Sequence, residues 1–478
     1  MKFFAQSSPN DRSLAGTWSG TLGGGAAKLR ILLNISKSGD AYSGSLNSLD
    51  QGAVLPMFAI RLDGGKVHFE IKAVGGVYDG TLDQDAKSIT GTWVQTGVPP
   101  QPLSFQRGAP PQAESSGPPP GPEKMALPPQ LDISASLSPT AFEAGGKWNL
   151  VYELRIANRE RWYCKLTRLE VVSADAGHKS LATFDAAYLD TMVTQAGRRD
   201  VAEPSNLPPG SFAVVYVWVT LDRRADVPSA IAQRLSEKIG THPDEFTLET
   251  APTPIHRNPV VVISPPLTGD NWLAGNGPSN TSVHRRALLS LGGRSYISQR
   301  FAIDWVRLYP DGKTFRGDRL DNSNYRAYGA EIHAVADGVV TEVKDGIPQN
   351  TPGPDSRAVP ITLQTIGGNH VILRIGEGLY AFYAHMQPGS IRVKIGDTVR
   401  RGQILGLVGN TGNSTEPHLH FDICDASSML ACEGLPYAFA SFEVQGRGWG
   451  WKSSESKEPP VKHEGEMPLE GDVVRFNP

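Results

Sequence analysis

Two histidines one position apart, in the stretch EPHLHFDIC (residues 416–424), have the type and spacing of a reactive site. The stretch is predicted to form a β-strand, in which successive side chains point to opposite faces. His418 and His420 are therefore expected to point toward one place. Two imidazoles that converge in this way can bind a metal ion together, or one can bind the ion while the other handles a proton.

A carboxylate inside an apolar stretch is the second candidate for chemistry. Asp304 stands in FAIDWV (residues 301–306), between Ile303 and Trp305. An isolated carboxylate is costly to bury unless something compensates its charge. A metal ion or a strong hydrogen-bond partner is therefore expected beside Asp304.

Five stretches of the C-terminal part carry a resemblance to a known family. They are AIDWV, HAVADGVV, GNHVILRIG, YAFYAHMQPGSIRVKIGDTVRRGQILGLVGNTGNST and PHLHFD, all within about residues 280–425, roughly a third of the chain. Their order resembles that of the lysostaphin-like zinc metalloendopeptidases, which share a duplicated hybrid motif and cut peptidoglycan. The resemblance implies a largely antiparallel β fold, Zn²⁺ in a cleft, and hydrolysis of the short peptide bridges or stems of peptidoglycan.

The same resemblance implies a role for four side chains. His420 and Asp304 match metal ligands, whereas His418 and the histidine of YAH, His385, match the pair beside the reacting water. This pair would orient or deprotonate the water and stabilise the oxyanion. A hydrolytic Zn²⁺ keeps three protein ligands and leaves one position open, so one ligand is still missing.

In the family, the third ligand is the histidine of the pattern His-x-Gly-x-Asp, and this sequence departs from that pattern. RFAID places Arg300 where the histidine is expected and Ala302 where the glycine is expected. Arginine offers only hydrogen-bond donors and does not ligate a cation. The nearest upstream histidine is His284, 20 positions before Asp304. A loop of this length can return an imidazole to the cleft, so His284 is the candidate third ligand, with a packing or loop-capping role as the alternative.

The cleft is also expected to contain substrate-binding side chains. Arg300 is assigned here because peptidoglycan stems end in a carboxylate, which a guanidinium binds well. Its alternative role is to neutralise Asp304 in place of a metal, which would make the site a relic. Asn276 and His370 are the other two candidates, with a structural role as the alternative for His370.

The elements that position these residues are predicted to be strands, because 51 Gly and 37 Pro favour many short strands joined by turns. We expect an all-β, multidomain chain. The N-terminal part is expected to form an antiparallel barrel or sandwich of about eight strands, closed by pairing of its two GTW stretches (16–18 and 91–93). The stretch VPSAIAQRLSEKI (227–239) is expected to form a helix. The predicted parts are a small β-barrel with a filled interior (10–107), a Pro-rich linker (108–129), an immunoglobulin-like sandwich (130–250), an antiparallel metallopeptidase domain (258–445) and a tail (446–478) that is a loop up to 466 and ends in the strand GDVVRFNP.

Bulk properties exclude some classes of partner. The 478 residues carry a net charge of −3, which provides no overall attraction to nucleic acid or anionic lipid. No apolar run reaches the length of about 18 residues that a membrane-spanning helix needs. The opening residues, MKFFAQSSPNDRSLAGTW, contain too short an apolar cluster for an export signal. Nothing in the sequence indicates an oligomeric state.

The cysteines leave the compartment open. Cys424 and Cys432, beside the HLH strand, could close a disulfide loop or remain two buried thiols, and Cys164 is expected to be a free core residue.

The leading functional hypothesis is a zinc metalloendopeptidase that hydrolyses peptide bonds of peptidoglycan. Its location would be extracytoplasmic, which is inferred from the implied substrate alone. Loss of the usual first ligand supports an alternative, a catalytically degenerate scaffold or regulator of the cell envelope. A carbohydrate-binding protein acting through the barrel is a third hypothesis, which leaves the order of the C-terminal motifs unexplained.

Overall fold

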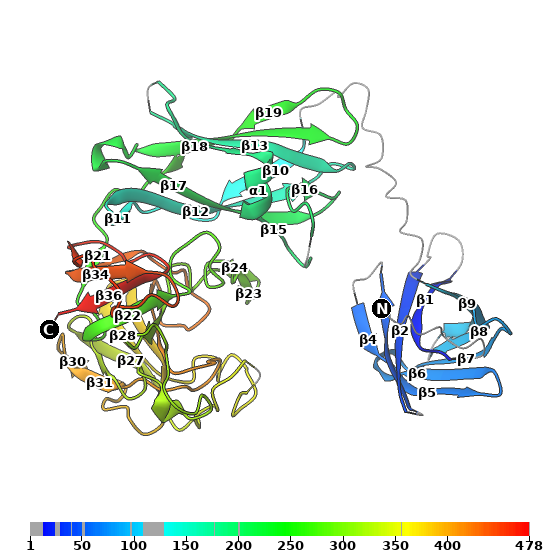
Figure 1. Cartoon of the computed structure of the whole chain (residues 1–478). Helices are drawn as coiled ribbons and strands as arrows, with labels where there is room; N and C mark the ends of the chain where they lie inside the picture. Colours follow the sequence, from blue (N-terminus) through cyan, green and yellow to red (C-terminus); the bar gives the residue numbers. More distant parts are fainter. Residues whose placement is uncertain are drawn as a thin grey trace, which may run out of the picture. The chain divides into compact units, whose positions relative to one another are not determined.

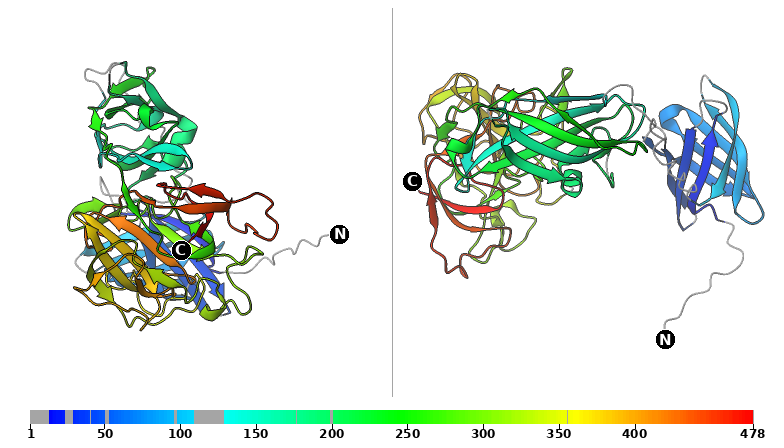
Figure 2. Two further views of the ribbon diagram at one scale, coloured as in Figure 1. Left: turned by 90° about the vertical axis from the view of Figure 1, so that its left-hand side faces the viewer. Right: turned by 90° about the horizontal axis from the view of Figure 1, so that it is seen from above.

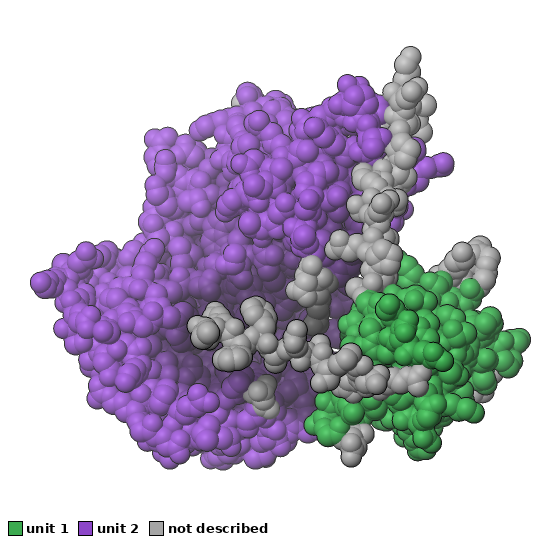
Figure 3. All heavy atoms as spheres, turned by 45° about the vertical axis from the view of Figure 1, so that its right-hand side comes forward, with its two compact units in different colours: residues 1–118 green, residues 119–478 purple. Residues whose placement is uncertain are grey.

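The computed structural model of the chain describes residues 13–23, 29–39, 41–49, 53–95, 98–108, 129–175, 177–198, 201–354 and 356–477. Within these residues almost all regular structure is β-strand, which confirms the predicted class. The chain divides into two compact units, residues 1–118 and 119–478 (Figure 3).

Unit 1 is a nine-stranded antiparallel sheet that curls into a nearly closed barrel (Figure 1). The strands lie in the order β4-β3-β2-β1-β9-β8-β7-β6-β5. Their bounds are β1 Gly16–Leu22, β2 Leu29–Ser38, β3 Ala41–Ser48, β4 Ala53–Pro56, β5 Phe58–Asp63, β6 Lys66–Ile71, β7 Gly76–Leu82, β8 Ser88–Gln95 and β9 Val98–Arg107, with a 3-10 turn η1 at Lys72–Val74. Where the two ends of the sheet approach each other, the Met57 amide donates to the Gly44 carbonyl at 2.9 Å.

The interior of this barrel is filled by its own side chains. Trp18, Phe69, Tyr78 and Phe105 are buried in one apolar cluster. The prediction that the two GTW stretches pair with each other is wrong. The first stretch lies in β1 and the second in β8, and β9 pairs with both strands and separates them.

The Pro-rich linker predicted at 108–129 lies almost entirely outside the described residues. Unit 2 then begins with a β-sandwich, whose two antiparallel sheets enclose one apolar core (Figure 1). One sheet has the order β10-β12-β17-β15, with β11 beside β12, and the other has the order β14-β13-β18-β19, with β16 beside β13 and β20 beside β18. The immunoglobulin-like classification stays a prediction.

The bounds of the sandwich elements follow. They are β10 Leu131–Ala135, β11 Phe142–Ala144, β12 Lys147–Asn158, β13 Cys164–Ser173, β14 Ser180–Asp185, α1 Ala186–Met192, β15 Val193–Gln195, β16 Asn206–Leu207, β17 Phe212–Leu221, η2 Arg224–Asp226, β18 Ala230–Ile239, β19 Phe246–Glu249 and β20 Thr253–Pro254. Cys164 is buried and free, as predicted.

The helix predicted at 227–239 is wrong, because strand β18 occupies most of this stretch. Ile231, Leu235 and Ile239 recur every four residues, which suits one face of a helix. In the strand, Gln233 and Glu237 share this face and are also buried. Two polar residues on the core-facing side therefore concealed the two-residue period.

Glu237 is an unusual core residue, because its side chain is fully buried and neither carboxyl oxygen has a hydrogen-bond partner. Burial, reinforced by Glu160, raises its pKa to about 8. The folded protein therefore keeps a proton that the unfolded chain releases above its ordinary pKa of 4.5, and stability falls as the pH rises from 4.5 toward 8.

We expect Glu237→Gln to stabilise the protein by roughly 4 kcal/mol at pH 8 and by little at pH 4.5. Urea unfolding of both proteins at the two pH values measures this difference. Glu245→Gln, at an exposed glutamate of the same sandwich, serves as the control and should show no comparable pH dependence. A gain that is equal at both pH values would contradict the prediction.

The rest of unit 2 is built on a ten-stranded antiparallel sheet. Its order is β30-β27-β28-β29-β32-β25-β22-β36-β34-β35. The bounds are β22 Gly269–Gly275, β25 Ile303–Arg307, β27 Gly338–Lys344, β28 Asn369–Gly376, β29 Leu379–Met386, β30 Thr398–Val399, β32 Leu419–Cys424, β34 Phe442–Arg447, β35 Val461–His463 and β36 Asp472–Phe476. Three two-stranded sheets and a turn accompany it: β21 Val261–Ile263 with β33 Tyr437–Phe439, β23 Leu289–Leu291 with β24 Arg294–Tyr296, β26 Glu331–His333 with β31 Ile404–Leu407, and η3 Asn322–Asn324.

The segment predicted to be a tail contributes to this sheet. The strand predicted in GDVVRFNP is β36, which pairs with both β22 and β34. Its red ribbon lies beside green β22 in Figure 1, and the red C-terminal end of the chain is seen from two further sides in Figure 2. The loop predicted up to residue 466 contains strand β35. The predicted domain boundaries stay predictions.

The core of the ten-stranded sheet extends into the sandwich. Trp272, Phe301 and Trp305 share one buried cluster with Phe142 and Val151 of strands β11 and β12. The rings of Phe142 and Phe301 meet edge to face, with centroids 5.4 Å apart. The two parts of unit 2 are thus held by apolar packing. Among the described residues, no helix combines the length and apolar character required to cross a membrane.

Candidate metal centre

The centre of the site is a cross-strand pair. Asp304 on β25 lies directly opposite His420 on β32 in the antiparallel register. The two side chains meet, with His420 Nδ1 at 2.9 Å from Asp304 Oδ1. This contact provides the partner expected for a carboxylate inside an apolar strand.

His418, two residues before His420, points to the same place, as the strand alternation predicted. Its Nε2 lies 3.3 Å from Asp304 Oδ1. Its Nδ1 faces the Glu416 carbonyl at 2.8 Å, and because a carbonyl only accepts, this nitrogen carries the proton. The Nε2 atom therefore faces the site and the Asp304 carboxylate.

His284 reaches the site from the loop between β22 and β23. Its Nδ1 faces the Asn276 carbonyl at 2.9 Å, and its Nε2 lies 3.4 Å from Asp304 Oδ2. Ligand atoms of His284, Asp304 and His420 lie within 4.8 Å of one another. Two imidazoles and a carboxylate form a donor set that suits Zn²⁺, so the residues present fit the metal that the resemblance implies.

His385 stands at the end of β29, the other neighbour of β32. Its backbone has φ of 66°, which is uncommon for a residue other than glycine. The Thr411 carbonyl accepts from its Nδ1 at 2.7 Å, which leaves Nε2 as an acceptor. Its ring centroid is 4.8 Å from that of His418 and 5.8 Å from that of His420.

One cavity of about 410 Å³ is lined by all five side chains described above, namely His284, Asp304, His385, His418 and His420. Apolar side chains form part of its wall, and Asn276, Gln299, Arg357, Asn413 and Thr415 supply further polar groups. The full set of lining residues is Asn276, Val283, His284, Ala287, Leu289, Gln299, Asp304, Arg357, Ile366, Gly367, Ala384, His385, Asn413, Thr415, His418, His420, Met429 and Leu430. The cavity is large enough for a few residues of a peptide.

A disulfide between Cys424 and Cys432 closes the loop that carries two of these residues, Met429 and Leu430. The Cα atoms of the two cysteines are 5.9 Å apart. The structure thus selects the disulfide from the two alternatives that the sequence left open.

Burial and the shared carboxylate together set the charges of the site. Burial alone would raise the pKa of Asp304, but the surrounding histidines, His284 first, hold it well below its usual range. Burial lowers the pKa of His284 to about 4 and that of His385 well below its usual range. For His418 and His420 burial also lowers the pKa, but Asp304 outweighs it and the pKa is raised.

Of the three residues predicted to bind substrate, only Asn276 lines the cavity. Its side-chain amide donates to Asp304 Oδ2 at 2.9 Å, so Asn276 orients the carboxylate. His370 is buried outside the cavity lining, with its ring nitrogens on the Gly368 carbonyl and the Glu342 carboxylate. The prediction that His370 lines the cleft is therefore wrong.

Both roles predicted for Arg300 are also wrong. Its side chain is buried, is absent from the cavity lining, and forms ion pairs with Glu153 at 2.9 Å and Glu433 at 2.8 Å. Two carboxylates elsewhere in unit 2 thus satisfy the guanidinium. The reasoning from sequence missed Glu153, although a lone Glu inside the apolar run NLVYELRIAN of β12 is the same kind of signal as Asp304.

Comparisons with known proteins match this part of the chain. The model of peptidase family M23 matches residues 324–431, a range that includes His385, His418 and His420 and begins after His284 and Asp304. Glycyl-glycine endopeptidase ALE-1 of Staphylococcus capitis is 46% identical over 93 residues, which are 19% of this chain and 24% of that protein. Peptidoglycan DD-endopeptidase ShyA of Vibrio cholerae is 40% identical over 78 residues, 16% of this chain and 17% of that protein.

The chain thus spans about a quarter or less of the length of these two relatives. Among solved structures, the catalytic domain of lysostaphin from Staphylococcus simulans is 24% identical, with 33% of this chain and 84% of that chain covered, at a TM-score of 0.19. That score is too low to support an inference. The family match and the order of motifs agree, and residues 324–431 of this chain form a domain of the lysostaphin-like peptidase family M23.

Proposed function

We propose that unit 2 is a zinc-dependent endopeptidase that hydrolyses peptide bonds in the cross-bridges or stems of peptidoglycan. One observation supports this most strongly: His284, Asp304 and His420 bring three ligand atoms within 4.8 Å of one another. The same cavity is also lined by His385 and His418. The names of the relatives support the class of substrate.

His284, Asp304 and His420 would hold the ion. When bound, Zn²⁺ supplies Lewis acidity toward a water molecule and a peptide carbonyl. Asn276 keeps the Asp304 carboxylate oriented through its 2.9 Å hydrogen bond, and the Asn276 carbonyl holds the His284 ring so that Nε2 faces the carboxylate. Such supporting contacts set the orientation and basicity of metal ligands.

His385 and His418 would carry out the proton transfers. Each ring donates from Nδ1 to a main-chain carbonyl, of Thr411 and Glu416 respectively, so each directs Nε2 toward the site. Two such nitrogens side by side allow one imidazole to take a proton from water. The ring that has gained this proton then passes it to the leaving amine, and an Nε2–H on the other ring would donate to the oxyanion.

The alternative, a degenerate scaffold or regulator, rested on Arg300 in the position of a ligand. Arg300 lies in a separate buried network, and His284 supplies the third ligand-type group, so this support is removed. An extracytoplasmic location is part of the proposal, and the Cys424–Cys432 disulfide supports it because such bonds persist in oxidising compartments.

Metal removal tests the proposal directly. We expect about one zinc per purified chain by mass spectrometry and release of muropeptides from isolated cell walls. Dialysis against a chelator should abolish this release, and added Zn²⁺ should restore it. A protein that takes up no zinc and releases no muropeptides would contradict the proposal and favour the scaffold.

A further inference from the structure

The three candidate ligands differ in what holds them in place. Asp304 lies in β25, which is paired on both sides, with β22 and with β32, and His420 lies in β32. His284 instead lies in the loop between β22 and β23, outside any strand. The position of the third ligand therefore depends on the contacts of this loop.

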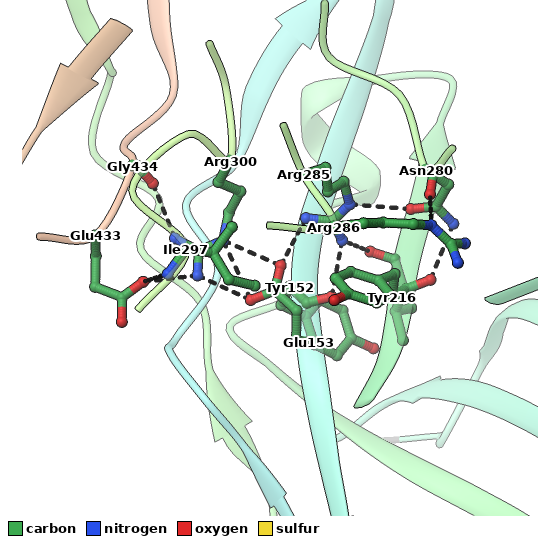
Figure 4. A network of polar contacts seen from close by, with 11 residues as sticks. Tyr152, Glu153, Tyr216, Asn280, Arg285, Arg286, Ile297, Arg300, Glu433 and Gly434 are labelled. Carbon is green, nitrogen blue, oxygen red and sulfur yellow. Dashed lines mark hydrogen bonds and ion pairs between the residues drawn. The ribbon is translucent and has the colours of Figure 1, made fainter. Parts of the chain in front are cut away.

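The residue next to His284 is inserted into the sandwich. Arg285 is 0% exposed, and its Nη1 donates to Glu153 Oε1 at 2.6 Å (Figure 4). Its Nη2 donates to the carbonyls of Tyr152 and Val217, both at 3.1 Å. One guanidinium thus binds two neighbouring sandwich strands, β12 and β17, through side-chain and main-chain oxygens.

Further contacts attach the same loop to the sandwich. Asn280 donates from its side chain to the Tyr216 carbonyl at 2.9 Å and accepts from Arg285 Nε at 3.1 Å (Figure 4). Arg286 donates to the Asn280 carbonyl at 2.8 Å and also reaches the Thr191 carbonyl. The Tyr216 ring packs against both guanidinium groups, at 5.5 Å and 4.9 Å.

Glu153 is the shared carboxylate of this arrangement. Arg300 donates to its two oxygens from Nε and Nη2, and Arg300 also pairs with Glu433 (Figure 4). Two guanidinium groups therefore face two carboxylates in a buried network. Burial alone would raise the pKa of Glu153, but Arg300 and Arg285 lower it, so the carboxylate stays ionised. Removing one partner of such a buried pair is strongly destabilising because it leaves the other charge buried and unpaired.

We propose that Glu153 and Arg285 are positioning residues for His284, so that the sandwich forms part of the metal site. This inference rests on the function proposed above. Among the described residues, the sandwich contributes no ligand to the clustered set. It holds the loop from which His284 faces Asp304.

Two substitutions in the full-length protein separate positioning from general stability. Arg285→Met cuts the loop from Glu153, whereas Arg300→Met removes the other guanidinium from the same carboxylate and leaves the Arg285 contacts in place. Both should lower the unfolding temperature of the zinc-free protein. We expect Arg285→Met to weaken zinc binding about 10- to 100-fold in competition with a chelating dye, and Arg300→Met to weaken it less than about threefold.

Arg285→Lys keeps the charge with fewer hydrogen bonds, so its zinc affinity should lie between those of the wild type and Arg285→Met. It also provides a folded variant if Arg285→Met does not fold. Equal weakening by Arg285→Met and Arg300→Met, or no weakening by any Arg285 variant, would overturn the proposal.

A crystal structure of a zinc-free Arg285 variant tests positioning without reference to zinc. We expect His284 to have moved from its distance of 3.4 Å to Asp304. If His284 keeps this distance, the positioning proposal fails. If the wild type binds no zinc but the loop moves in the variant, the proposed function fails and the positioning stands.

Discussion

Replacing His284 with alanine is expected to weaken zinc binding by more than about 100-fold and to abolish the release of muropeptides. Loss of a residue that only supports a ligand already costs about 10–100-fold in affinity, and a direct ligand contributes more. Without His284, the ion would have only Asp304 and His420 from the clustered set. Zinc content after gel filtration and titration against a chelating dye measure the loss.

His333→Ala is the matched control for this substitution. His333 lies on β26, outside the cavity lining, with its Nδ1 at 3.1 Å from the Gly402 carbonyl. The substitution His333→Ala therefore removes an imidazole from the same unit without changing the metal site, and the zinc content of the protein should be unchanged. If His284→Ala retained full zinc affinity, the third ligand would be a different residue.

Replacing either histidine of the proposed proton-transfer pair should lower the activity without releasing the zinc, unlike the replacement of His284. We expect His418→Ala and His385→Asn to retain zinc and to lower kcat for cleavage of wall peptides by about 10²–10⁴-fold, the usual contribution of a positioned acid or base. Asparagine is chosen at position 385 because it tolerates the backbone φ of 66° better than alanine.

Zinc content and kcat must be measured on the same preparations. Because His418 Nε2 lies 3.3 Å from the Asp304 carboxylate, a loss of zinc in His418→Ala would identify this residue as a ligand. The double variant should be little worse than the more damaging single variant, since the two imidazoles act in one reaction. Simple multiplication of the two effects would indicate independent roles.

The strand-borne half of the site could be predicted from the sequence. Strand alternation places His418 and His420 on one face, and burial requires a partner for Asp304. Both arguments are local, and the structure confirms them in the contacts of Asp304 Oδ1 with the two rings. His385 required the family resemblance, because one histidine on a strand carries no signal of its own.

The loop-borne half could be predicted only in part. His284 is a candidate because it is the nearest upstream histidine, but nothing in the local sequence indicates where its loop returns. The role of Arg300 could not be predicted, because its partner Glu153 lies 147 positions away in the sequence. Local patterns identify a buried charge but do not name its distant counter-ion.

For the fold, too, local sequence patterns predict some elements and fail to predict others. Strands whose apolar residues alternate or run without interruption can be predicted, whereas β18 resembles a helix in sequence because Gln233 and Glu237 occupy its core face. The order of strands in the barrel depends on β9, whose residues Pro99, Pro100 and Pro102 conceal a strand.

The apolar core shared by the sandwich and the ten-stranded sheet limits how this chain can be shortened. A truncated version starting at residue 258, the boundary suggested by the motifs, would lose Phe142 and Val151 and uncover Phe301. Exposed aromatic surface of this kind promotes aggregation during expression. Attempts to graft the metal site onto another carrier should therefore transfer residues 129–477 as one piece.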